Sequence, residues 1–418
     1  MILKKIIFFF TISFTYCFSQ AGSSSPFSAA GLGDINFRGT QVTRFMGGLD
    51  VFSDSIHANL NNPASYGDLK LTTYSLGIHY KTNLMMSTDS RKYKAIAALD
   101  YLAVGIPAGK FGFGFGLIPY SSIGYKIQSM HNDDGISKIN MHQGSGGLNQ
   151  VFLTIGFPLF KYFTTGVTMN YGFGTLFYRT SQFKENVNLG TFLSNSSSIS
   201  GFSYQVSFNA KIPIKKQYMF RVMYSIEPNV NFDSRNERTI YTQDINGTRI
   251  SDFEEIDLGI IGKKETKLPL FEKKKFGFGF GKTKKWFVGF QKNSINSTIF
   301  RTEFIETDNI RYASGSQFSI GGFYIPNFFS LRSYWKRVVY RFGYRRENTG
   351  LIFNSFPLKE TSFSFGLGLP MAGFSNANVG VEFGRRGEKN KFFIQETFFT
   401  FRIGFSLNDK WFLKRKYN

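Results

Sequence analysis

The sequence predicts an all-β fold, a single transmembrane antiparallel β-barrel of about 14 strands. Three observations predict it: an export signal at the N-terminus, alternation of apolar and polar residues over many segments, and many aromatic residues without long apolar runs. The chain has 51 Phe and 21 Tyr among 418 residues, so its hydrophobicity must be distributed by alternation. No linker or composition shift divides it, which favours one large unit over several soluble domains.

The first 20 residues have the layout of a secretory signal peptide. Lys4 and Lys5 form the charged region, an apolar run covers 6–14, and small polar residues follow from Ser19. The run is about half of the ~20 residues that a spanning helix needs. We expect cleavage near 19–22 and export to the outer membrane of a Gram-negative cell. Cys17 would leave with this peptide, so the mature chain would hold neither a disulfide nor a thiolate metal site.

Apolar and polar residues alternate through most of the chain after residue 71. Between 202 and 212 the even positions are Phe202, Tyr204, Val206, Phe208, Ala210 and Ile212, and the odd positions are Ser, Gln, Asn or Lys. The same alternation occurs at 74–80, 362–369 and 399–407. Successive side chains of a strand point to opposite faces, so each segment presents one apolar stripe to one surface of a sheet.

A soluble β-sandwich would also alternate, but two observations favour a barrel. The segments reach the ~9–11 residues that cross a bilayer as tilted strands, and their polar faces suit a lumen better than a second packed core. Open sheet edges in lipid would leave backbone groups unpaired, which requires closure. We count roughly fourteen segments, with short turns at one end and, at the other, long loops expected at 119–147, 183–199 and 229–269. Asn246-Gly247 predicts a hairpin inside the last loop.

The alternation also predicts which charged residues face the lumen. In the later segments we place six of them inward: Arg337, Arg341, Arg345, Glu382, Glu396 and Arg402. Unpaired charges in a lumen are costly unless water reaches them, so we expect Arg–Glu pairs across it. Structural bracing is the default role of such pairs, and anion recognition is the alternative.

Two segments, 110–117 and 275–281, alternate strictly between Phe and Gly. They are not phosphate-binding loops, because no strand-then-helix pattern surrounds them. The alternation instead puts six glycines in the lumen: Gly112, Gly114, Gly116, Gly277, Gly279 and Gly281. Inward glycines leave space for a plug segment or a ligand to approach the wall, or they reflect ordinary packing within the barrel.

The stretch from Gly22 to Asp68 does not alternate, and it carries motifs that resemble a known family. In order, these are Gly31-Leu32-Gly33-Asp34, Met46-Gly47-Gly48 and Asn62-Pro63-Ala64. The last of them is similar to the Asn-Pro-Ala element that precedes the first strand of FadL-like outer-membrane transporters. Three further segments, 144–150, 334–343 and 407–412, resemble the Bacteroidota branch of that family. The resemblance spans nearly the whole mature chain.

The resemblance implies a fourteen-stranded barrel that carries hydrophobic small molecules past an N-terminal hatch to a lateral exit in the wall. The chain would then divide into a signal peptide (1–20), a hatch that plugs the lumen (21–70) and the barrel (71–418). Asn62, Pro63, Ala64, Gly47 and Gly48 would be hatch or gating residues, with Pro63 fixing φ and Asn62 bonding the turn. The family's exit depends on a kink in an early strand, which the sequence does not locate.

The same branch contains barrels that transport no small molecule, such as the PorV-type subunit of type IX secretion. An accessory subunit of an envelope secretion or protein-assembly complex is therefore the alternative function. A continuous apolar pocket in the lumen and hydrophobic outer loops would favour transport, but the expected outer loops here are mostly polar.

Charge and residue types exclude other functions. The net charge of +22 fits contact with phosphates of outer-membrane lipid and lipopolysaccharide, or with an acidic protein, although lysines in solvated turns explain much of it. Nucleic acid is not a partner in this compartment. The four histidines show no metal-ligand spacing, and no nucleophile motif is present. His131 near Asp133 and Asp134 is typical of a loop turn. We therefore expect no enzyme activity, no cofactor and no metal.

Overall fold

The computed structural model describes residues 22–88, 90–133, 136–215, 217–244, 248–298, 300, 304, 310–371, 373, 375–389 and 393–411. The expected signal peptide and the Asn246-Gly247 turn lie outside these residues, as do Asp134 and the side chains of His131 and Asp133. Among the described helices, none is long and apolar enough to cross a membrane.

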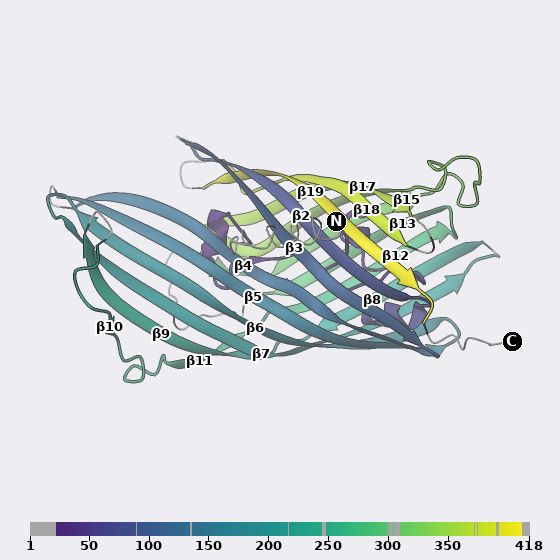
Figure 1. Cartoon of the computed structure of the whole chain (residues 1–418), viewed down its shortest axis with the longest axis horizontal. Helices are drawn as coiled ribbons and strands as arrows, with labels where there is room; N and C mark the ends of the chain where they lie inside the picture. Colours follow the sequence, from purple (N-terminus) through teal and green to yellow (C-terminus); the bar gives the residue numbers. More distant parts are fainter. Residues whose placement is uncertain are drawn as a thin grey trace, which may run out of the picture.

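Consecutive antiparallel strands form a closed barrel of 14 strands (Figure 1), which confirms the predicted fold class. The barrel closes because the last strand pairs with the first, from Gln395 opposite Met86 to Asp409 opposite Thr72. Its strands are β2 (Thr72–Met86), β3 (Arg91–Ala108), β4 (Phe111–Asp133), β5 (Ile136–Phe160), β6 (Phe163–Lys184), β7 (Leu189–Pro213), β8 (Tyr218–Glu227), β12 (Glu272–Lys282), β13 (Trp286–Asn296), β15 (Gly315–Tyr324), β16 (Val339–Phe353), β17 (Phe356–Pro370), β18 (Asn376–Arg386) and β19 (Gln395–Asp409).

The alternation seen in the sequence separates an apolar outside from a polar inside. In β7, Phe202 and Tyr204 are 63% and 47% exposed, whereas Ser203 and Gln205 between them are buried. Exposed Phe and Tyr side chains recur on neighbouring strands and form an apolar band around the barrel. Such a band is the surface that a membrane barrel presents to lipid.

One side of the wall is much longer than the other. Strands β4 to β7 have 22 to 25 residues, whereas β12 and β13 have 11 each. Three further strands continue the long side, with β9 pairing to the outer half of β7: β9 (Asn231–Asp244), β10 (Glu254–Glu255) and β11 (Glu265–Pro269). We call this part, visible at the left of Figure 1, the outer extension.

The outer extension corrects the expected long loops. Most of 119–147 and 183–199 is paired strand with a short connection, and about half of 229–269 is strand, in β9, β10 and β11. These segments extend beyond the apolar band, where a strand needs no apolar outward face. The backbone can therefore pair fully without the alternation by which strands were recognised in the sequence.

The opposite end of the barrel carries the shorter connections, such as Gly109-Lys110 and 283–285, and we call it the turn end. The longest described connection there joins β15 to β16 through 325–338. In outer-membrane barrels the end with short turns faces the periplasm.

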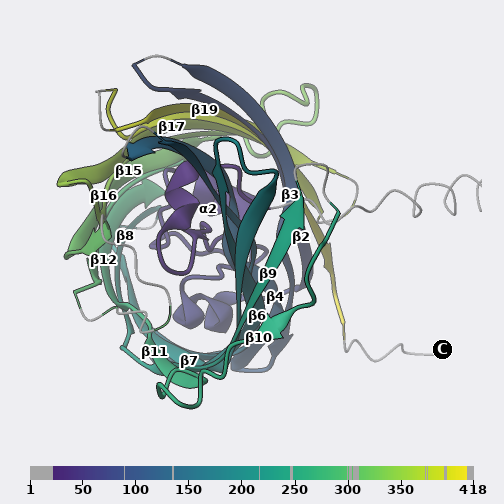
Figure 2. The same cartoon turned by 90° about the vertical axis from the view of Figure 1, so that its left-hand side faces the viewer.

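Residues 22–71 lie inside the barrel and form what we call the plug (Figure 2). Its elements are short: η2 (Pro26–Ala29), β1 (Asp34–Ile35), α2 (Gln41–Arg44) and η3 (Pro63–Asp68). Phe45, Met46 and Leu49 are fully buried, and Met46 packs in one apolar cluster with Met223 and Phe287 of the wall. The plug thus supplies much of the apolar core that a wide barrel would otherwise lack.

The inward glycines of the Phe/Gly segments serve both purposes considered from the sequence. A Cβ atom on Gly112 would lie 1.8 Å from the carbonyl oxygen of Tyr66 in the plug, so only glycine permits this approach. Gly277 lies against Val51 of the plug, whereas Gly279 packs against Phe287 of the neighbouring strand.

The substitution Gly112→Val tests this close approach. The added side chain would displace the backbone of the plug at Tyr66, so we expect the free energy of unfolding to fall by about 3 kcal/mol, the upper end of overpacking costs. Urea unfolding of the refolded barrel in detergent measures it. Phe113→Leu, an outward change on the same strand, is the control, and equal stabilities of the two variants would contradict the expectation.

Candidate functional site

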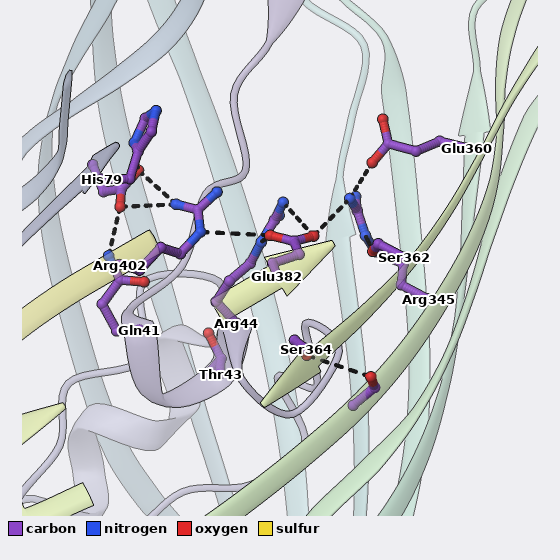
Figure 3. Close-up of polar contacts among 12 residues, drawn as sticks. Gln41, Thr43, Arg44, His79, Arg345, Glu360, Ser362, Ser364, Glu382 and Arg402 are labelled. Carbon is purple, nitrogen blue, oxygen red and sulfur yellow. Dashed lines mark hydrogen bonds and ion pairs between the residues drawn. The ribbon is translucent and has the colours of Figure 1, made fainter. Parts of the chain in front are cut away.

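Glu382 of β18 lies at the centre of a network of ion pairs between plug and wall (Figure 3). Arg44 of the plug donates two hydrogen bonds to it, from Nε at 2.7 Å and from Nη2 at 2.9 Å. Arg345 and Arg402 approach the same carboxylate from the wall at 3.4 and 3.5 Å. All four side chains are buried, and the plug contributes the third guanidinium group around one wall carboxylate.

The network continues to both sides of Glu382. Toward β3, Arg402 pairs with Asp100 at 2.9 Å, and Asp100 also bonds the His79 ring and the side-chain amide of Gln41 in the plug. Toward β17, Arg345 pairs with Glu360 and with Glu347. In Figure 3 the side chains from His79 through Arg402, Glu382 and Arg345 to Glu360 therefore form one continuous polar row from β2 to β17, with the start of α2 beside it.

Asp100 reaches the lumen because of a β-bulge. Gly77 pairs with Tyr101 and Ile78 pairs with Leu99, which leaves Asp100 as an extra residue without a partner on β2. A bulge bends its strand, and β3 pairs with β4 only from Leu102 to Ala108. The bulge is thus an irregularity in an early strand of the barrel.

Among the described residues, the outer half of β3 makes no pairing with β4 from Ile118 onward, so the hydrogen-bonded wall is interrupted there. The plug strand β1 lies at this opening and pairs with β4, Asp34 opposite Ser122 and Ile35 opposite Ser121. Asp34 is held in turn by Arg386 of β18 at 2.7 Å and by Ser23. We call this feature the wall gap, and β1 closes part of it.

The Asn62-Pro63-Ala64 element is bonded to the wall by two of its three residues. The Asn62 side chain bonds Asn209 and Ser207 of β7, and the Ala64 N–H donates to Ser207 at 2.7 Å. Pro63 begins η3, where its missing N–H costs nothing. We expected Asn62 to bond its own turn, but its side chain makes no such cap and fixes the turn to the wall.

Gly47 and Gly48 form the turn after α2. Their φ values are +73° and +85°, which side chains rarely adopt, and the backbone of Gly47 lies against β16. A Cβ on Gly343 would come within 1.9 Å of the Gly47 nitrogen. The two glycines therefore bring the plug backbone into direct contact with the wall.

Five of the six charged residues expected in the lumen are buried there: Arg341, Arg345, Glu382, Glu396 and Arg402. Glu396 accepts a hydrogen bond from Ser25 of the plug at 2.6 Å. The placement of Arg337 on a strand is wrong, because β16 begins at Val339 and Arg337 lies in the preceding connection. Arg337 nevertheless lines a cavity between plug and wall together with Arg341.

Sequence reasoning missed the plug's own members of the network, above all Arg44, Asp34 and Gln41. They lie in a segment without periodicity, so no pattern indicated where their side chains point. It also missed Asp100, because the bulge that turns this side chain inward breaks the alternation. A carboxylate within an otherwise apolar strand was the one signal that could have singled it out.

The environment of the plug shifts the acidity of its charged groups. Burial lowers the pKa of the Arg44 guanidinium to about 10, although Glu382 opposes the shift, so Arg44 stays protonated at neutral pH. Burial alone would raise the pKa of the Asp54 carboxyl. His57, with its charge and its hydrogen bond at 2.7 Å, together with backbone N–H groups, instead lowers that pKa to about 2.

The cavity beside the network is lined by charged and apolar side chains in similar measure. Its volume is about 250 Å³, and its lining includes both signs of charge, among them Asp34, Arg38, Arg44, Asp50, Lys81, Asp100, Glu227, Lys273, Lys275, Arg345, Glu347, Glu360, Arg386 and Arg402. Within the described part of the chain, no group of three His, Cys, Asp or Glu side chains could hold a metal ion. The ion pairs and hydrogen bonds of the network hold the plug against the wall.

Comparisons with known proteins agree with this architecture. A family model described as BamG matches residues 1–418. No curated protein matches the sequence. Among solved structures, the toluene transporter TbuX of Ralstonia pickettii superposes with a TM-score of 0.61 at 12% identity, over 89% of this chain and 99% of that one.

Two further solved structures are similar. The toluene transporter TodX of P. putida gives a TM-score of 0.60 at 13% identity over 90% and 99% of the two chains. A FadL homologue of Pseudomonas aeruginosa gives 0.57 at 9% identity over 89% and 98%. The resemblance to FadL-like barrels is thus confirmed at the level of the fold, whereas the Bacteroidota branch stays a prediction. These neighbours are transporters and not enzymes.

Arg44→Ala tests whether the network fixes the plug. Removing one partner of a buried pair typically costs about 3–5 kcal/mol, so we expect a loss of that size in the free energy of unfolding measured in urea. Lys267→Ala is the matched control, because its pair with Asp233 is 69% and 71% exposed and contributes at most about 1 kcal/mol. Equal losses in the two variants would contradict a special role for the buried network.

Proposed function

The chain belongs to the BamG family, and we propose that it acts in the outer membrane as a non-catalytic, plugged barrel, an accessory subunit that binds another protein of an envelope secretion or assembly complex. Its apolar band would contact outer-membrane lipid and lipopolysaccharide, and its outer extension would contact the partner.

The single observation that carries this proposal is the fixation of the plug. Buried bonds join it to strands around the barrel: Gln41 to β3, Arg38 to β6, Asn62 to β7, Lys275 of β12 to Asp50, Gln291 of β13 to Asp50, Arg386 of β18 to Asp34 and Glu396 of β19 to Ser25. A hydrophobic solute in the lumen would have to separate several such pairs or dissolve in a cavity lined by charges, and each broken buried pair costs several kcal/mol. The contacts in the lumen therefore favour a barrel that stays closed over one with a transport pathway.

The outer extension supports the second half of the proposal. Its strands extend beyond the apolar band on one side only, so the barrel presents a paired sheet outside the membrane. Exposed side chains there are mixed: Gln182, Thr191 and Ser198 are polar, whereas Met130, Phe253 and Ile260 are apolar. A paired sheet with apolar side chains among polar ones suits the contact of a subunit with its neighbour.

Photo-crosslinking in the native outer membrane tests this function. We expect a photoreactive phenylalanine at Gln182 or Ser198 to give a discrete crosslinked product with one envelope protein, because both positions lie on the outer extension. The same residue at Lys161, an exposed position of the turn end, is the matched control. Isolation of the tagged chain in mild detergent should yield the same protein in stoichiometric amount; a barrel recovered alone and without crosslinks would refute the subunit proposal.

The wall gap favours a second candidate function, the passive uptake of hydrophobic small molecules. The gap opens within the wall beside the bulge at Asp100, and transporters of toluene share the fold. In this function the plug would be a hatch, and Asn62, Pro63, Ala64, Gly47 and Gly48 would control its position.

Changing the hatch while measuring uptake tests the second candidate. If the plug gates a pore, the double substitution Asn62→Ala and Pro63→Ala should change the rate at which cells take up labelled toluene, because it removes the side-chain bonds of Asn62 to β7. Ser198→Ala on the outer extension is the control. Unchanged uptake by a barrel that still folds would count against gating.

A further inference from the structure

The outer half of β3 has a strand partner on one side only. β2 pairs with all of 91–101 except Asp100, the bulged residue. β4 pairs with β3 only from Leu102 onward, so in the described part of the chain residues 91–101 have one free edge. The hairpin of β2 and β3 projects beyond the neighbouring wall at the top of Figure 2. A row of backbone N–H and C=O groups therefore faces the wall gap without a strand to bond it.

The facing edge of β4 differs, because the plug covers it beside the gap. β1 pairs there with Ser121 and Ser122. Further along, the Gly124 N–H donates to the hydroxyl of Ser28 in the plug at 3.2 Å. Among the described elements, none of the plug pairs with β3 between 91 and 101. The plug thus occupies one side of the wall gap and leaves the edge of β3 available.

Part of this free edge lies at the depth of the apolar band. On β2, Ile78 and Tyr80 are 45% and 50% exposed, and they lie opposite Leu99 and Ala97 of β3. Lipid offers no hydrogen bonds, so each unpaired backbone group at this depth raises the free energy of the folded barrel. A further strand would supply the missing bonds, which is how extended segments bind to exposed sheet edges.

The side chains along the edge select among possible strands. Arg91, Lys92 and Lys94 are exposed, as is Lys126 on the facing part of β4. Neither 91–99 nor 118–132 contains Asp or Glu. Lysines at a sheet edge commonly prevent pairing with other edges, and here they would repel the same edge of a second copy of this chain. A strand that carries carboxylates is attracted instead.

We propose that the free edge of β3, from Arg91 to Tyr101, pairs with an extended, acidic segment of another envelope protein. The segment adds one strand beside β3, and its carboxylates meet the cationic side chains at the outer end of the edge. No proline lies between 91 and 101, so every residue there keeps its N–H donor. This interface rests on the proposed subunit function, and it adds a contact across the wall gap from the outer extension.

Amide hydrogen exchange measures strand addition directly. The chain in native outer-membrane vesicles is compared with the purified chain in nanodiscs made from the same lipids. About half of the amides of 91–101 point to the free edge. We expect these amides to exchange about 10-fold more slowly in the vesicles, where the partner is present. Equal exchange in the two samples overturns the proposal, because lipid or the chain itself would then account for any protection.

Charge reversal tests the acidic character of the added strand. Lys92→Glu together with Lys94→Glu should return the exchange of 91–101 in vesicles to the rate seen in nanodiscs. Lys110→Glu together with Lys161→Glu, at exposed positions of the turn end, is the matched control and should leave the protection unchanged. Full protection in the folded Lys92→Glu, Lys94→Glu variant overturns the proposal.

Proline substitution tests whether the backbone makes the contact. Consecutive N–H groups of a strand point to opposite edges, so of Ala97→Pro and Ala98→Pro one breaks a bond to β2 and the other removes only a donor at the free edge. We expect the variant that keeps the heat stability of the barrel to lose most of the protection in vesicles. Unchanged protection in that variant overturns strand addition.

The crosslinks from Gln182 and Ser198 separate this interface from the proposed function. Crosslinks without protection of 91–101 overturn strand addition and leave the subunit function standing. Protection of 91–101 without crosslinks supports strand addition and moves the partner contact from the outer extension to β3. Absence of both overturns both proposals.

Discussion

The structure depends on the contact of Arg44 with Glu382. A barrel of this width encloses polar strand faces and several buried charged side chains that need partners. Glu382 meets Arg345 and Arg402 from the wall and Arg44 from the plug, so the plug enters the barrel as a counter-charge as well as an apolar filling. Because separating buried charges is costly, plug and wall behave as one folded unit.

The two ends of the molecule follow from how far the apolar band extends along each strand. Within the band, strands must alternate and close, since lipid offers no hydrogen bonds. Beyond it, β4 to β7 continue as a polar sheet that β9 and β11 widen. The bulge at Asp100 separates β3 from this sheet, and β1 of the plug occupies part of the opening. The asymmetry of the barrel thus comes from the unequal lengths of its strands, and the wall gap lies beside the register shift in β3.

The sequence predicts which face a side chain occupies when the residue belongs to a regular strand. It does not do so for residues in connections or in the plug. Arg341, Arg345, Glu382, Glu396 and Arg402 were assigned to the lumen because strict alternation fixes the face of each residue. Arg337 was misplaced, since the same parity was extended past the start of β16 into a connection. The two cavities could not be foreseen, because each is lined by plug residues that no period relates to the wall.

The sequence by itself determined the fold class, the number of strands and the two faces of the wall, because lipid outside and a polar lumen inside impose a period of two on every strand that crosses the membrane. Only the tertiary structure decided which charges pair and where the pairing of the wall is interrupted. These features depend on a bulge at one residue and on a plug without periodicity, so contacts between residues far apart in the chain decide them.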